Sequence, residues 1–151
     1  MTFDFDSAVS AAIVSSIVSL LVSLIIKIWQ DKTDKLSSLD SQLDSILRIA
    51  VEYPYLESVE FTRTWKENVN NLDDKYRRYE TYATLVFNYL SRVCEYFHYN
   101  EKKINAYIDM KGWVELHHVY WHNPSKLGEN EFVYDEKFKK LVHAILGGIP
   151  Q

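Results

Sequence analysis

The sequence SAVSAAIVSSIVSLLVSLII, from Ser7 to Ile26, contains no charged residue, proline or glycine. As an α-helix with a rise of about 1.5 Å per residue, it is roughly 30 Å long, which matches the hydrocarbon core of a bilayer. A single segment in lipid must satisfy its own backbone hydrogen bonds, and a helix does so. The segment therefore predicts a transmembrane helix, with residues 1–30 as an N-terminal anchor.

The charges on either side of this segment predict its orientation. Asp4 and Asp6 precede it, whereas Lys27, Lys32 and Lys35 follow it. Because the more basic flank stays on the cytoplasmic side, we expect a single pass with the N-terminus outside and the C-terminal domain in the cytoplasm. A cleaved signal peptide and a buried core helix are the alternatives, but no small-residue cleavage site follows the apolar run.

Small residues gather on one face of the predicted anchor, and larger aliphatic residues form the opposite face. The small residues are Ala8, Ala11, Ala12, Ser15, Ser16, Ser19 and Ser23. Small side chains let helices approach closely in lipid, and serine hydroxyls form hydrogen bonds across the contact. The face predicts a homo-oligomer. Its serines either line a narrow water-filled pore or bond back to the preceding turn of their own helix in a plain anchor.

Residues 31–52 are expected to continue the anchor as a stalk helix. Its apolar positions alternate in steps of three and four residues, and they are Leu36, Leu39, Leu43, Ile46 and Ala50. This spacing is typical of a coiled-coil seam between subunits. It is equally typical of an amphipathic helix that packs on its own domain, and both interpretations stay open.

Residues 53–151 predict one compact helical bundle, so the fold class is all-α. Tyr53-Pro54 ends the stalk helix, and a second helix is expected from about Tyr55 to Val69. Asp73 and Asn100 are expected to cap the helices that follow them. The longest of these, residues 74–99, carries the predicted buried stripe Tyr79, Ala83, Val86, Leu90, Val93 and Phe97. The single cysteine, Cys94, suits a reducing compartment and core packing.

Charge and motifs exclude several functional classes. The net charge of −4 does not favour stable binding of duplex DNA. No glycine-rich phosphate loop is present, so the sequence predicts no cofactor. Glu115, His118 and His122 share a helical face and could ligate a metal, but a di-metal site in a helical bundle also needs a second such helix. Histidines that bond to carbonyls at a helix end are the alternative interpretation.

Arg92 and His98, within RVCEYFH, resemble the arginine–histidine signature of the HEPN ribonucleases, whose fold is also a small helical bundle. The resemblance implies a catalytic role for these two residues. This sequence departs from the family pattern because Val93, rather than a polar residue, follows the arginine. Their spacing also puts the two side chains on different faces of one helix.

The layout of the whole chain, with its anchor, its stalk and the segments FNYLSRVCEYF and WVELHHVYW, resembles the small membrane effectors of bacterial anti-phage systems. The resemblance implies a homo-oligomer that perturbs the inner membrane, as a pore or channel, in response to a nucleotide, an oligonucleotide or a partner defence protein. The alternatives are a membrane-tethered adaptor without a pore and, least favoured, a membrane-bound nuclease. Apart from that last alternative, the protein is not expected to be an enzyme.

Overall fold

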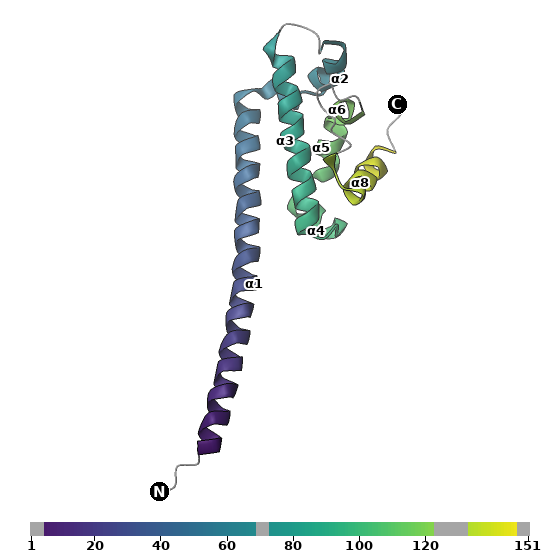
Figure 1. Ribbon diagram of the computed structural model, residues 1–151. Coiled ribbons are helices and arrows are strands. Elements are labelled where there is room, and N and C mark those ends of the chain that lie inside the picture. The colour runs from purple at the N-terminus through teal and green to yellow at the C-terminus, as the bar shows by residue number, and fades with distance from the viewer. Residues whose placement is uncertain (1–4, 69–72, 123–132, 148–151) are drawn as a thin grey trace. The chain divides into compact units, whose positions relative to one another are not determined.

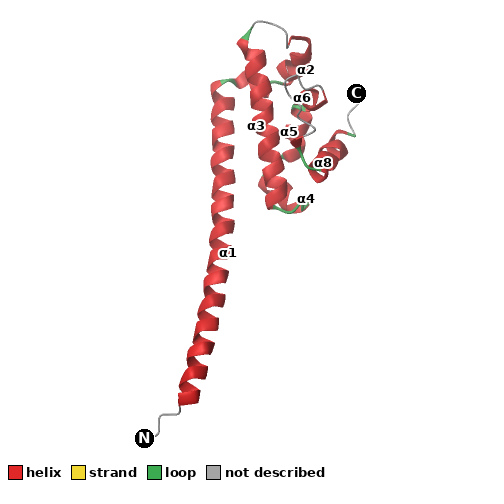
Figure 2. Ribbon diagram, in the orientation of Figure 1, coloured by secondary structure: helices red, strands yellow, loops and turns green. Residues whose placement is uncertain are grey.

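The protein is all-α in the computed structural model, and the predicted fold class is confirmed at that level. The structure describes residues 5–68, 73–122 and 133–147, with side chains from residue 15 onward. Figure 2 shows helices joined by short loops, and no strand, in these described ranges.

The helices follow one another along the chain with short connections (Figure 1). They are α1 (Phe5–Glu52), the 3₁₀-helix η1 (Pro54–Glu57), α2 (Val59–Asn68), α3 (Asp74–Tyr96), α4 (Glu101–Tyr107), α5 (Met110–Leu116), α6 (His118–His122) and α8 (Glu136–Leu146).

Helix α1 contains the predicted anchor and the predicted stalk without a break between them. It ends as predicted at Tyr53, whose N–H donates to the carbonyl of Ile49 at 2.9 Å, and Pro54 opens η1. In the part of the chain that the structure describes, no helix has both the length and the apolar character that crossing a membrane requires. The membrane span stays a prediction.

The chain divides into two units, Met1–Ser38 and Leu39–Gln151. This division differs from the expected boundary at residue 53, because the end of α1 belongs to the second unit. Leu39 and Ile46 are buried in the core of that unit. The Asp40 carboxylate accepts a hydrogen bond from Tyr107 at 2.6 Å. Residues 39–52 therefore pack on their own domain, as the second interpretation of the stalk expects.

Helix α3 supplies most of the core of the second unit. The predicted stripe residues Tyr79, Ala83, Val86, Leu90 and Val93 are all buried. Helix α3 ends at Tyr96, three residues earlier than expected, because His98 and Tyr99 have φ angles of 52° and 59°. These left-handed conformations stop an α-helix.

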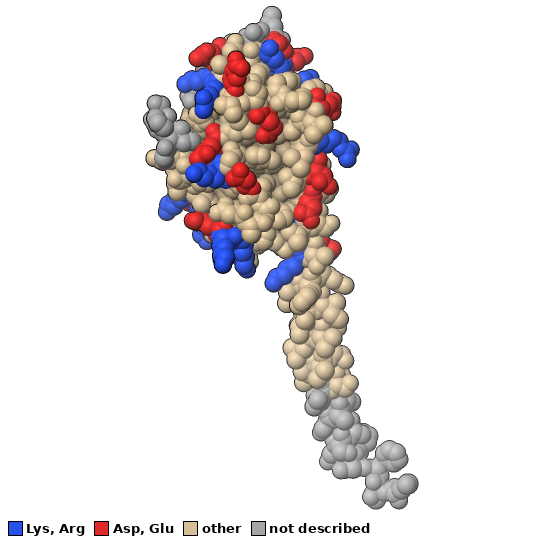
Figure 3. Space-filling view, turned by 180° about the vertical axis from the view of Figure 1, so that it is seen from behind, with Lys and Arg blue, Asp and Glu red and all other residues tan. Residues whose placement is uncertain are grey.

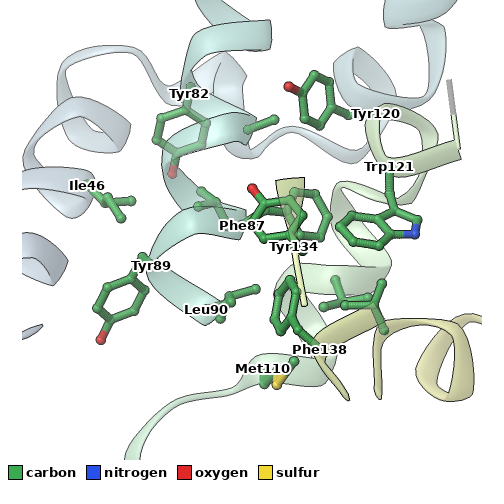
Figure 4. Close-up of a cluster of buried hydrophobic side chains, with 14 of the residues drawn as sticks. Ile46, Tyr82, Phe87, Tyr89, Leu90, Met110, Tyr120, Trp121, Tyr134 and Phe138 are labelled. Carbon is green, nitrogen blue, oxygen red and sulfur yellow. The ribbon is translucent and has the colours of Figure 1, made fainter. Parts of the chain in front are cut away.

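Aromatic rings fill the space between α3 and the helices around it. Figure 4 shows Phe87, Tyr120 and Trp121 close to one another in the buried cluster. The ring centroids of Phe87 and Trp121 are 4.9 Å apart, and the indole N–H of Trp65 donates to the carbonyl of Tyr76 at 3.0 Å. Because the rings bring large apolar areas and few polar atoms, they suit a small core.

Polar caps begin four of the described helices, and Asp109 is the cap of α5. Asp73 caps α3 and Asn100 caps α4, both as predicted, and Asp135 caps α8. The single helix expected from about residue 55 is divided instead, because Ser58 has an extended backbone between η1 and α2. This division places Glu57 at the end of a separate short helix.

Candidate functional site

A buried polar cluster joins three elements that are far apart in the sequence. Glu57 comes from η1, Tyr79 and Tyr82 from α3, and His117 from the junction of α5 and α6. At this junction the N–H of His117 donates the last hydrogen bond of α5 to the carbonyl of Trp113. The carbonyl of His117 accepts a hydrogen bond from the N–H of Tyr120 in α6. The backbone at this break holds the imidazole inside the bundle.

Two hydrogen bonds and one close contact connect the four side chains. The Tyr79 hydroxyl and Nδ1 of His117 are 3.0 Å apart. Nε2 of the fully buried His117 has no hydrogen-bond partner and lies 3.6 Å from Oε1 of Glu57. The Tyr82 hydroxyl donates a short hydrogen bond to the same Oε1. When Nδ1 accepts a hydrogen bond from the Tyr79 hydroxyl, Nε2 carries the ring hydrogen and faces Glu57.

This arrangement keeps Glu57 ionised. Burial opposes the charge and raises the pKa of Glu57, but the neighbouring imidazole of His117 and the hydrogen bond from Tyr82 outweigh burial and hold the pKa below its ordinary value. Burial, together with the neighbouring carboxylate of Glu57, raises the pKa values of Tyr79 and Tyr82 well above the ordinary range. Both tyrosines are therefore neutral donors at physiological pH, and the carboxylate is the acceptor.

Glu57 also lines a cavity of about 440 Å³ in the second unit. The cavity lies between η1 and α2 on one side and α5 and α6 on the other, and its walls combine apolar and charged side chains. The lining residues are Glu57, Val59, Thr62, Arg63, Gly112, Trp113, Glu115, Leu116 and His118. This volume falls in the range that small-molecule sites occupy.

The predicted metal ligands do not form a metal site. Glu115 and His118 lie on different helices because α5 ends at Leu116, and Nδ1 of His118 is 2.7 Å from the carbonyl oxygen of Glu115. His122 is exposed at the end of α6. Within the described residues, no group of three or more histidine, cysteine, aspartate or glutamate side chains is arranged to hold a metal ion.

The two residues that resemble the nuclease signature lie at different kinds of position. Arg92 is exposed on α3 and donates to the side-chain oxygen of Gln42 at 2.6 Å. His98 follows the end of α3 and is also exposed. The interaction of Arg92 connects α3 to the end of α1, which is a structural role.

The predicted small face of the anchor is described only in part. The side chains of Ala8, Ala11 and Ala12 lie outside the described residues. Ser15, Ser16, Ser19 and Ser23 are exposed. The hydroxyl of Ser23 donates to the carbonyl of Ser19 at 2.8 Å, so it bonds to the preceding turn of its own helix.

The predicted stalk seam contacts the bundle of the same chain. Leu39 and Ile46 are buried in its core, and Leu43 and Ala50 pack against that core. Leu36 is half-buried in the first unit.

Sequence reasoning missed the Glu57–His117 pair. It singled out Glu115, His118 and His122 for their helical spacing, whereas the structure buries His117 at the break between α5 and α6. No local pattern pairs Glu57 with His117, because their contact depends on the tertiary fold. The signal that could have indicated a buried histidine was the pair His117-His118 just before the aromatic residues Tyr120 and Trp121.

The comparisons with known proteins identify no relative: no family model, curated protein or solved structure matches the chain.

Proposed function

We propose that this chain is a membrane-anchored protein that self-associates and acts at the bacterial inner membrane, with its helical bundle in the cytoplasm. The observation that carries the proposal is the apolar surface of α1. Eight large aliphatic residues on this surface are about half exposed or more, and they are Ile17, Val18, Leu20, Leu21, Val22, Leu24, Ile25 and Ile26. Figure 3 shows part of this surface without charged side chains.

An exposed apolar surface of this extent requires a covering. Scattered single apolar residues are normal on a protein surface, but a contiguous patch marks contact with lipid or with another chain. The exposed residues here surround the helix rather than follow one stripe, and a helix that is apolar on all sides is suited to lipid. Trp29, which is 72% exposed, and Lys27 follow the segment, as expected where a helix leaves the membrane.

The finer proposal is an effector whose anchors associate through the small face and open a pore in response to a signal in the cytoplasm. The chemistry that supports association is the row of serines, since small residues allow close contact between helices in lipid. The signal would be a nucleotide, an oligonucleotide or a partner protein, as the resemblance to anti-phage effectors implies.

One observation favours a second candidate, a membrane-tethered adaptor without a pore. The Ser23 hydroxyl bonds to the carbonyl of Ser19 within the same helix. A serine whose hydroxyl is satisfied in this way needs neither water nor a partner helix. The adaptor would use the same anchor to hold its bundle, and whatever the bundle binds, at the membrane.

Fractionation, oligomer size and membrane potential test these proposals in sequence. The full chain should sediment with membranes and require detergent for extraction; recovery in the soluble fraction would refute the anchor. Ser15→Leu with Ser19→Leu adds volume to the small face and should dissociate the oligomer. The matched control, Ile17→Phe with Leu21→Phe, adds volume to the opposite face and should leave it intact.

The pore and the adaptor differ in the membrane potential. A pore predicts that expression in bacteria collapses the signal of a potential-sensitive dye, and that the paired serine substitutions restore it while the control pair does not. A wild-type chain that oligomerises and leaves the potential unchanged would reject the pore in favour of the adaptor. A strictly monomeric wild-type chain in mild detergent would reject self-association.

A further inference from the structure

We propose that the cavity beside Glu57 is a binding site for a small organic monocation that carries a guanidinium or ammonium group on a short apolar body. The proposal concerns the second unit alone, and it does not rest on the membrane anchor or on self-association. It rests on the position of the Glu57 carboxylate, on the oxygen of that carboxylate that is available as a hydrogen-bond acceptor, and on the residues that line the cavity.

Glu57 is less exposed than Glu115 and Arg63, which also line the cavity. Its side chain is 29% exposed, compared with 39% for Glu115, and Arg63 is exposed. Glu115 is already paired with Lys111 at 3.6 Å. A ligand that enters the cavity therefore meets Glu57 as an anion whose negative potential is weakly screened by solvent.

Among the described residues, the neighbours of this carboxylate approach only one of its oxygens. The Tyr82 hydroxyl and Nε2 of His117 both approach Oε1. The described residues contribute no hydrogen bond to Oε2, which leaves an acceptor for a ligand donor. His117 is fully buried, and its Nε2 lacks a hydrogen-bond partner. Tyr82 and His117 therefore position the carboxylate of Glu57 without neutralising its negative charge.

The other walls suit an apolar body with a single positive charge. Val59 and Leu116 supply aliphatic surface, and Trp113 supplies an aromatic ring, which attracts cations through its face. Arg63 repels a second positive charge, so the site favours a monocation over a polyamine. A planar guanidinium would offer Oε2 two parallel donors, the strongest form of this contact.

The test compares n-butylguanidinium with n-butylurea, which has nearly the same shape and no charge. Both are titrated into the full-length chain in detergent while the four indole N–H signals are followed by NMR. Trp113 lines the cavity, whereas Trp65 and Trp121 are buried elsewhere and Trp29 lies in the first unit. The guanidinium should shift the Trp113 signal with a Kd of about 1 mM, as expected for so small a ligand.

Two variants assign the effect to the carboxylate. Glu57→Gln keeps the size of the side chain and removes its charge, so binding should weaken at least tenfold, which is roughly the loss of one charge-assisted hydrogen bond. The control Glu60→Gln removes one exposed charge from α2 outside the cavity and should bind like wild type.

Three results would overturn the proposal: equal binding of the guanidinium and the urea, movement of all four indole signals together, and wild-type affinity in Glu57→Gln. The Trp65 and Trp121 signals report whether Glu57→Gln is folded. If that variant does not fold, the comparison of the two ligands on the wild-type chain decides. A failure here would leave the membrane proposal untouched, since fractionation and oligomer size do not involve this cavity.

Discussion

Removing the hydroxyl of Tyr79 tests the polar cluster directly. Tyr79→Phe keeps the ring, and with it the contacts to Phe61, Trp65 and Tyr120 at centroid distances of 5.6, 5.6 and 6.4 Å. It removes the only hydrogen-bond partner described for the His117 side chain. Both ring nitrogens of a fully buried histidine would then be unsatisfied.

The expected loss follows from that orphaned nitrogen. A buried polar group left without a partner costs about 1–3 kcal/mol. If the free energy of unfolding falls by about 2 kcal/mol, and each kcal/mol lowers the midpoint of thermal unfolding by about 4 °C in a domain of this size, that midpoint should fall by roughly 8 °C. Circular dichroism at 222 nm of the full chain in detergent measures that midpoint.

Tyr89→Phe is the matched control on the same helix. Tyr89 is also fully buried, but its hydroxyl has no hydrogen-bond partner, and the nearby Tyr107 hydroxyl donates to Asp40 instead. Removing an unsatisfied hydroxyl should leave the midpoint unchanged or raise it. Equal losses in the two variants would refute the assigned role of the Tyr79 hydroxyl, because the chemical change is the same in both.

Three further predictions concern single residues. Because the pKa of Glu57 in the folded chain lies below its ordinary value of 4.5, the ionised carboxylate adds stability above pH 4.5, and this stability is lost as the pH falls through the folded-state pKa. The free energy of unfolding of Glu57→Gln, measured with urea between about pH 3 and 5, should therefore depend less on pH than that of wild type. Parallel pH curves would contradict this prediction. Gly112→Ala would place a Cβ in steric conflict with Oδ2 of Asp109, the residue that caps α5. Displacing that cap should lower the free energy of unfolding by about 1 kcal/mol in the same urea assay. An unchanged midpoint would show that Asp109 caps equally well from another rotamer. Burial raises the pKa of the Cys94 thiol to about 12, so N-ethylmaleimide should label the folded chain far more slowly than the urea-unfolded chain, and equal rates would place the thiol at the surface.

The helices and their caps could be predicted from the sequence because their causes are local. Tyr79, Val86 and Val93 recur at helical spacing along α3, and all three are buried. Asp73 and Asn100 precede helices and accept the N–H groups of Lys75 and Lys103. Pattern and capping act within one or two turns, so a single sequence carries them.

The polar cluster could not be predicted, because its members meet only through packing. Glu57 follows Tyr55 and Leu56, in what the sequence predicts as the first turn of one longer helix. Its separation from α2 depends on the extended backbone of Ser58. The inward position of His117 depends on a break between two short helices that carries neither proline nor glycine.

The stalk shows a different limit. Apolar residues spaced by three and four predict which face of a helix is buried, but they do not predict whether the same chain or another chain buries it. Leu39 and Ile46 are covered by the bundle that follows them in the same chain. The exposed residues of α1 from Ile17 to Ile26 have no such covering, and for this reason the proposed membrane contact is placed there.

The Glu57–His117 pair is costly as a device for stability alone. Taking a carboxylate out of water carries a penalty that the attraction to a partner often fails to recover, and apolar residues of similar size frequently stabilise a core equally well or better. Here the partner nitrogen is 3.6 Å away and makes no hydrogen bond, so among the described residues Tyr82 is the hydrogen-bond donor to this carboxylate. A carboxylate held ionised at the wall of a cavity is more consistent with recognition of a ligand than with packing.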